Sequence, residues 1–320
     1  MKVFILLLVI WAALFPGAAL AQQHPLGDIG KPGDYDQTIR DFTREKRALD
    51  ALPVSYDWRS SGKVTVAKDQ QSCGSCWAFV VAGVLESRIL MAGGGSYDLS
   101  EQQVLSCNSF GYNCNGGSMN GLAFYYSLGP MQESCTHYPS SSGAVPSPAC
   151  STLSACSQLN ARTFGYYTVD FTDVAAIKTS LMNDGPAYFR FDVHSDFDTY
   201  WNSGAAGSVY VNHANSLLGG HAGLIIGWDD AKAAWLIKNS WGAATGPNHD
   251  GTYWMAHAGH AFNLNFGMGS VRATWSGSGG GAVVPALSLP GEIALSFLLV
   301  ASGFFILRRQ KARQETRRKR

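Results

Sequence analysis

Apolar residues in the first half of the chain recur at helical spacing. Between Cys76 and Leu90 they return every three or four positions, and the glycines at 93–95 end the run. This pattern predicts an apolar helix. A second helix is predicted from Ser100, because a serine followed three positions later by Gln103 forms a capping box. The first half of the chain is therefore predicted to be helical.

The second half of the chain carries a different pattern. Beyond about residue 160, short apolar runs separated by glycines predict β-strands. These runs cover residues 187–193, 208–211, 222–228 and 234–238. Together the two halves predict an α+β fold class.

A cysteine lies where a loop becomes the first predicted helix. Cys76 would sit in the first turn, where unpaired amides and the helix dipole favour an anion and lower the pKa of a thiol. Taken alone, the pair Cys73 and Cys76 would also fit a disulfide, a redox dithiol or half of a zinc site. The sequence has no second Cys-x-x-Cys and no His-x-His at metal-ligand spacing, and no preceding strand pattern typical of thioredoxin. The residues therefore favour a reactive thiol, and no metal or cofactor is predicted.

Three segments of the chain together resemble a known family. They are the run 70–79 around Cys76, the run Gly219-Gly220-His221-Ala222, and residues 235–242 with Asn239. In this order, and with Leu52-Pro53, Asp57-Trp58-Arg59 and Cys114-Asn115-Gly116-Gly117, they resemble the papain-like cysteine peptidases over about residues 52–272. The resemblance implies a two-lobed fold with a helical amino-terminal lobe and an antiparallel β-barrel carboxy-terminal lobe. The active site would lie in the cleft between the lobes.

The resemblance also implies roles for the catalytic residues. Cys76 would attack the scissile carbonyl, and His221 would protonate the leaving amine and then activate water. Asn239 would orient the His221 ring, and Trp241 would shield that hydrogen bond from water. Gln70 would donate its side-chain amide to the oxyanion, alongside the backbone N–H of Cys76.

Substrate contacts follow from the same resemblance. Gly116 and Gly117 would present backbone groups to an extended peptide. Ala222 and Val271 would line the pocket for the second residue before the scissile bond, called P2, and Trp241 is a further expected contact. An apolar P2 residue is therefore expected.

The predicted function is that of a monomeric cysteine endopeptidase, a thiol protease that hydrolyses peptide or protein substrates through an acyl-enzyme. Two alternatives remain open. One is a transpeptidase or ligase that uses the same thioester, and the other is a surface protein that binds peptides without cleaving them.

The chain has seven cysteines, so six remain for disulfides if Cys76 is the nucleophile, which favours an oxidising compartment. The resemblance suggests Cys73 with Cys114, Cys107 with Cys150, and Cys135 with Cys156, and the last two pairs could be exchanged. All six lie in the first half of the domain. Phe266 stands where the resemblance places a further cysteine, so the second half is expected to rely on packing.

The amino terminus reads as a secretory signal over residues 1–21, with an apolar run after Lys2 and the small-residue site Ala19-Leu20-Ala21. Residues 22–51 are too few for the long helical propeptide of common papain-like zymogens. They form either a short propeptide that blocks the cleft or a linker, and composition favours the linker.

The carboxyl terminus resembles the tripartite sorting signals of bacteria, of the IPTL/PEP-CTERM type. A Gly/Ser-rich linker over residues 273–290 contains Val284-Pro285-Ala286-Leu287, a predicted transmembrane segment covers residues 291–307, and the basic tail is 308–320. The near-neutral net charge of +1 hides this tail. The predicted transmembrane segment has an uncharged core of 15 residues, which would span only about 22 Å of a hydrocarbon layer of about 30 Å. A processed signal and a plain anchor therefore both remain open.

The basic tail would stay cytoplasmic, which places the peptidase across the inner membrane, in the periplasm or at the cell surface. A sorting transpeptidase is then an expected partner, besides the membrane itself. Nucleic acid is not expected, because the basic residues directly follow a membrane-length apolar run.

Overall fold

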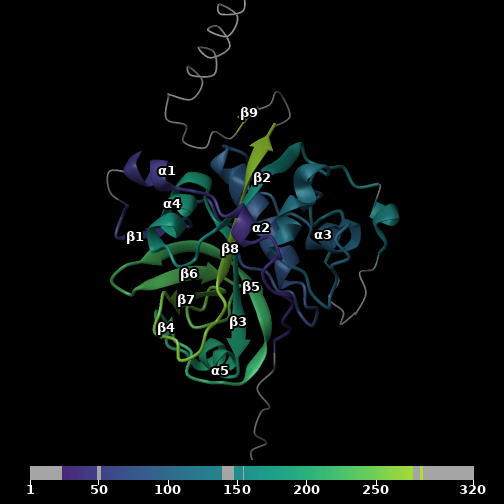
Figure 1. The fold of residues 1–320 in the computed structure, drawn as a ribbon. Coiled ribbons are helices and arrows are strands. Elements are labelled where there is room, and N and C mark those ends of the chain that lie inside the picture. Colours follow the sequence, from purple (N-terminus) through teal and green to yellow (C-terminus); the bar gives the residue numbers. More distant parts are fainter. Residues whose placement is uncertain (1–23, 49–51, 139–147, 154, 277–281, 284–320) are drawn as a thin grey trace, which may run out of the picture.

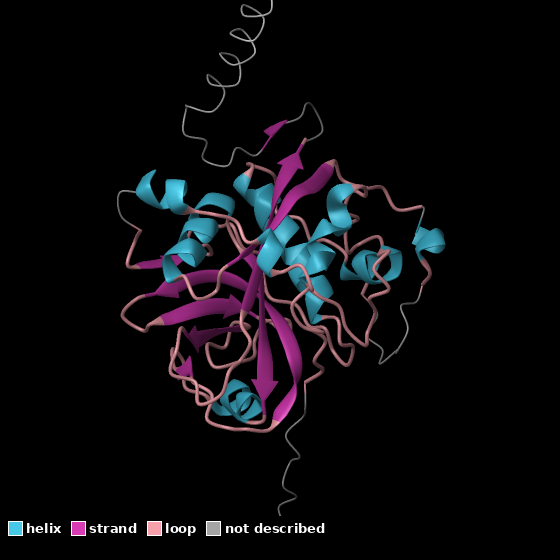
Figure 2. Cartoon of the chain, in the orientation of Figure 1, coloured by secondary structure: helices cyan, strands magenta, loops and turns pink. Residues whose placement is uncertain are grey.

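The computed structural model describes residues 24–48, 52–138, 148–153, 155–276 and 282–283. Helices α2 and α3 lie to one side, and most strands form a separate layer beneath them (Figures 1 and 2). The predicted α+β fold class is confirmed, and the arrangement agrees with two lobes.

The helices of the first lobe are α2 (Cys76–Met91) and α3 (Glu101–Cys107), with the 3-10 segments η2 (Met119–Tyr126) and η3 (Cys150–Leu153). Helices α4 (Val174–Asp184) and α5 (Asp196–Ser203) belong to the second half of the chain, and η1 (Asp36–Thr38) and α1 (Thr43–Ala48) precede both lobes.

One sheet carries the described strands in the order β2-β8-β3-β5-β6-β7-β4, with β1 added on β5 and β9 on β8. The strands are β1 (Ser55–Asp57), β2 (Ala161–Val169), β3 (Ala187–His194), β4 (Val209–Tyr210), β5 (Leu217–Asp229), β6 (Ala234–Lys238), β7 (Thr252–Ala256), β8 (Gly267–Trp275) and β9 (Ala282–Val283). All pairings between them are antiparallel except that of β4 with β7.

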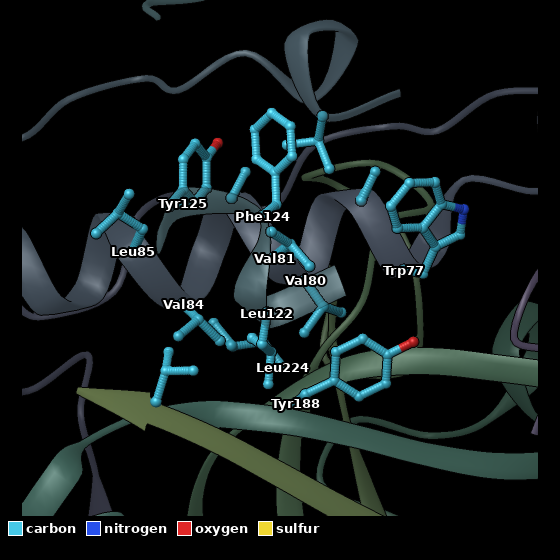
Figure 3. Packing of buried hydrophobic residues seen from close by; sticks show 14 of the residues in the cluster. Trp77, Val80, Val81, Val84, Leu85, Leu122, Phe124, Tyr125, Tyr188 and Leu224 are labelled. Carbon is cyan, nitrogen blue, oxygen red and sulfur yellow. The ribbon is translucent and has the colours of Figure 1, made fainter. Parts of the chain in front are cut away.

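Helix α2 is buried on nearly all sides, which is why its sequence is apolar around most of its circumference. Figure 3 shows its side chains between η2 on one face and Leu224 and Tyr188 of the sheet on the other. Its charged residues are buried with it. Arg88 ties the helix to β8, because its Nε donates to the Val271 carbonyl at 3.0 Å and its Nη2 to Ser270 Oγ at 3.0 Å.

Helix α3 begins at the predicted cap. The Ser100 hydroxyl accepts a hydrogen bond from the Gln103 N–H at 3.1 Å. The other half of the capping box is absent, because the Gln103 side chain binds the Gly129 carbonyl and the Met131 N–H instead. The capping pattern therefore located the helix start but not the partner of its glutamine.

Three disulfides lie in the first half of the domain. Their pairs are Cys73–Cys114, Cys107–Cys150 and Cys135–Cys156. Within the described residues Cys76 is the free cysteine. The bridge at Cys73 fastens the loop before α2 to the loop that carries Gly116 and Gly117.

The segment before the domain is packed rather than free, unlike the linker that composition favoured. Tyr35 and Phe42 are buried, and the Tyr35 hydroxyl donates to the Val169 carbonyl at 2.5 Å. Arg40 forms an ion pair with the buried carboxylate of Asp184 at 2.8 Å. Residues from 24 onwards therefore follow the surface of the domain as part of its structure.

The expected carboxy-terminal boundary also differs. Strand β8 continues to Trp275, whose ring lies against Tyr97 at a centroid distance of 5.2 Å, so residues 273–275 belong to the domain and not to the linker. The predicted signal peptide, transmembrane segment and basic tail lie outside the described residues. Among the residues that are described, no helix is long and apolar enough to cross a membrane.

Candidate active site

The thiol of Cys76 lies at the start of α2, as predicted, and is fully buried. Gly74 brings the preceding loop close to its neighbour, donating its N–H to the Cys114 carbonyl at 2.9 Å. A Cβ on Gly74 would lie 2.4 Å from that carbonyl oxygen, so only glycine fits there. The Cys73–Cys114 disulfide holds the same approach covalently.

His221 and Asn239 come from adjacent strands. His221 lies within β5, and Asn239 follows the last residue of β6, whose partner in β5 is Leu224. His221 Nε2 and Asn239 Oδ1 are 2.7 Å apart. The Trp241 ring lies 4.5 Å from the His221 ring, centroid to centroid. Both members of the hydrogen bond are buried, and the indole lies beside the His221 ring.

The Cys76 thiol contacts strand β5 at Ala222, the residue that follows His221. The sulfur of Cys76 accepts from the backbone N–H of Ala222, which follows His221 in β5, and from the N–H of Trp77. His221 Nδ1 is buried and has no hydrogen-bond partner within the described residues. The ring nitrogen that does not bind Asn239 is therefore free to exchange a proton with the thiol.

Both groups are neutral in this closed state. Burial, with a smaller contribution from the Asp28 charge, raises the pKa of the Cys76 thiol to about 12. Burial also lowers the pKa of His221 to about 4, against the opposing effect of its bond to Asn239. An ion pair of Cys76 thiolate and His221 imidazolium would require water or substrate to enter the site first.

Gln70 aims its side-chain amide at the site. Its Oε1 accepts from Ser240 Oγ at 2.6 Å, which leaves Nε2 as the donor. That Nε2 donates to the Cys73 carbonyl at 2.9 Å and to the Pro25 carbonyl at 3.1 Å. The amide expected to donate to an oxyanion therefore donates to two carbonyls of the chain itself in this structure. The next residue, Gln71, has a φ of 52°, in the left-handed region that favours glycine.

Residues 24–30, here called the strap, run through the cleft between the lobes. The Gly117 N–H donates to the Gly27 carbonyl at 2.9 Å, and the Ile29 N–H donates to the Gly117 carbonyl at 3.0 Å. On the other side the Asp28 N–H donates to the Gly220 carbonyl at 2.9 Å. Gly117, predicted to bind an extended peptide, therefore binds an extended segment of its own chain.

The strap contacts the candidate catalytic residues directly. The Gly27 N–H is a hydrogen-bond donor to the Cys76 sulfur, and a Cβ on Gly27 would lie 1.9 Å from the Gly74 oxygen. The His24 ring stacks on Trp241 with centroids 4.3 Å apart. Gly116, the other predicted backbone contact, has a φ of +132° and a close approach to the strap, since a Cβ there would lie 2.6 Å from Ile29 Cγ2.

Ala222 and Val271, the residues expected to line the P2 pocket, lie in packed surroundings. Ala222 lies opposite Arg190 in the pairing of β5 with β3, and Val271 lies in the core under α2. Sequence reasoning missed Arg190 and Tyr188, which bind the Asp28 carboxylate. A signal was present, because Tyr188, Arg190 and Asp192 alternate with apolar residues in a strand of period two.

Comparison with known proteins agrees with the fold. The model of the papain family cysteine proteases matches residues 52–266. Cathepsin O of Homo sapiens is 33% identical over 200 residues, covering 61% of this chain and 59% of that protein. Cathepsin S of Bos taurus is 33% identical over 215 residues, covering 64% and 61%.

Among solved structures, the chain is similar to the digestive procathepsin L2 proteinase of Tenebrio molitor larval midgut. The TM-score is 0.61 at 29% identity, covering 81% of this chain and 80% of that one. The chain belongs to the papain family of cysteine proteases. It spans 59% and 61% of the length of the two cathepsins above.

Proposed function

We propose that this chain is a cysteine endopeptidase that hydrolyses peptide bonds through an acyl-enzyme on Cys76. The observation that carries the proposal is a free thiol at a helix start, beside a histidine whose far nitrogen is held by Asn239 at 2.7 Å. Nucleophile, base and orienting group are the set that thioester chemistry needs.

Each residue has a defined step. His221 Nδ1 takes the thiol proton, and Cys76 Sγ attacks the scissile carbonyl carbon while the carbonyl oxygen accepts from Gln70 Nε2. The protonated His221 then gives its proton to the leaving amine as the C–N bond breaks. It next takes a proton from water, which attacks the thioester and releases the acid and the thiol.

The strap must leave before this reaction can start. The Pro25 carbonyl accepts the hydrogen bond that Gln70 Nε2 would donate to the substrate oxyanion. The Cys76 sulfur accepts from the Gly27 N–H, where the carbonyl carbon of a substrate would have to lie. These contacts support the propeptide interpretation of residues 22–51 over the linker interpretation. In this proposal the amino-terminal segment keeps the peptidase latent.

The disulfides support export to an oxidising compartment. The finer proposals, a periplasmic or surface location with a carboxy-terminal anchor or sorting signal, rest on the sequence of residues beyond the described domain. Intact mass of the cell-derived protein tests them, since an end near residues 284–288 supports processing and an end at Arg320 supports an anchor.

Product analysis with a peptide library, with and without an added amine acceptor, tests the proposed reaction. Cys76→Ala should lower cleavage by roughly 10⁴-fold or more. His221→Ala should cost more than Asn239→Ala, because Asn239 orients the base and transfers no proton. Products joined to the amine would support the transpeptidase alternative. Intact peptides with a full-length Gly27→Ala chain, whose added Cβ would displace the strap, would contradict both.

A further inference from the structure

A buried carboxylate anchors the strap in the cleft. The Asp28 side chain is fully buried, with its Oδ1 2.8 Å from Arg190 Nε and its Oδ2 2.8 Å from the Tyr188 hydroxyl. The Gly30 N–H also donates to Oδ1, at 2.9 Å, from within the strap. Two of the three donors therefore belong to the cleft wall and stay when the strap leaves.

The wall residues are held in place independently of the strap. Tyr188 and Arg190 lie two positions apart in β3, on the same face of the strand. Arg190 Nη1 donates to the Asn265 carbonyl at 2.7 Å, and Nη2 to Asp192 Oδ1 at 2.7 Å. Figure 3 shows the Tyr188 ring against the first turns of α2, with its hydroxyl towards the Trp77 end of the helix. Asp192 therefore holds the Arg190 guanidinium at Nη2, and Nε remains the donor to the carboxylate in the pocket.

The pocket lies where a substrate side chain would enter. Asp28 is paired with Gly117 on one side and Gly220 on the other, and the neighbouring Gly27 lies on the Cys76 sulfur. A substrate that pairs with Gly117 and presents a carbonyl to Cys76 would place its second residue, P2, where Asp28 now lies. The donors Arg190 and Tyr188 would then face the P2 side chain.

We infer that the P2 pocket selects an acidic side chain, Asp or Glu, which binds Arg190 and Tyr188 in place of Asp28. This inference rests on the proposed peptidase function and replaces the expectation of an apolar P2 residue. A carboxylate accepts from both donors, whereas an apolar side chain would leave a guanidinium N–H and a hydroxyl buried without acceptors. Sites built to hydrogen-bond a substrate group discriminate strongly against analogues that lack it.

Cleavage of a proteome-derived peptide library by the full-length chain tests the inference, both as the wild type and as Gly27→Ala, whose added Cβ would lie 1.9 Å from the Gly74 oxygen and displace the strap. Cys76→Ala is the blank. Products should be enriched in Asp and Glu at P2. In matched synthetic peptides that differ only at P2, kcat/KM should be roughly 10- to 100-fold higher for Glu than for Leu. Enrichment of Leu, Val or Phe at P2, without acidic residues, would overturn the inference and leave the peptidase function intact. No Cys76-dependent cleavage by the Gly27→Ala chain, in which the strap no longer blocks the site, would remove the function and the inference together.

Two variants identify the residues responsible. Tyr188→Phe removes one hydroxyl, and Arg190→Gln removes the charge. Each should therefore lower the ratio of kcat/KM for the Glu peptide to kcat/KM for the Leu peptide. The ratio is the readout because both substitutions also weaken the strap, which raises access for both peptides equally. A Glu-to-Leu ratio that stays at the wild-type value in Tyr188→Phe and in any folded Arg190→Gln protein would overturn the assignment of these residues.

Discussion

At the scale of single residues, the site shows strain beside the oxyanion donor. Gln71 follows Gln70 and has a φ of 52°, and its N–H donates to Asp69 Oδ1 at 2.7 Å. A residue other than glycine that is held in this left-handed region lowers the stability of the fold by about 1–3 kcal/mol. The loop therefore keeps a left-handed conformation at position 71, although glycine, which adopts that conformation freely, is absent there.

Replacing Gln71 tests this strain. Gln71→Gly should raise the free energy of unfolding by up to about 1 kcal/mol, because relief of strain is partly offset by the greater freedom of glycine in the unfolded chain. Gln71→Val should lower it by about 1 kcal/mol or more, since β-branched residues avoid this region. Urea midpoints at unchanged m-value measure both. A loss of stability in Gln71→Gly would show that the glutamine side chain stabilises the loop.

At the scale of elements, the sequence predicted the helix start and the strands that carry the proposed catalytic residues. Cys76 at a helix start, His221 in a strand and Asn239 after the next strand were readable from local motifs. The strap was not, because its docking depends on contacts such as Asp28 with Arg190, 162 residues apart in the chain. Its composition, rich in polar residues, proline and glycine, is that of a linker, and only the fold supplies its partners.

The strap can be released by a single methyl group. Gly27→Ala should displace it, since the added Cβ would lie 1.9 Å from the Gly74 oxygen. The full-length variant should then cleave peptide without a lag and react faster with thiol reagents. Gly33→Ala is the matched control, because a Cβ at Gly33 meets nothing within 4 Å. Equal initial rates for the two variants would contradict the proposal that the strap blocks the site.

At the scale of the whole molecule, the two halves of the domain are stabilised differently. The described disulfides all lie in the first half, whereas the second half packs aromatic rings. Phe266, which stands where the resemblance placed a cysteine, lies against Phe171 and Phe189 at centroid distances of 5.2 and 5.4 Å. The expectation that this half relies on packing therefore has a physical basis.

The closed cleft between the halves also sets the charge state of the site. Under the strap, burial raises the pKa of Cys76 to about 12 and lowers that of His221 to about 4. The thiolate is the reactive species, so a raised pKa leaves little of it at neutral pH. Once water enters, the cost of burying charge falls, and the helix start together with His221 stabilises the thiolate.

Alkylation of Cys76 as a function of pH distinguishes the two states. In the wild-type chain with the strap in place, the rate at pH 7 should be low and should still rise with pH through the alkaline range, because deprotonation follows the raised thiol pKa. In Gly27→Ala the ion pair should form, so the rate should already be substantial at acidic pH, with an acid limb near ~4. Mass spectrometry of the labelled, unreduced protein identifies the modified residue. Identical profiles that both follow an unperturbed thiol, with a single rise near ~8.5, would show that neither the strap nor His221 controls the reactivity of Cys76.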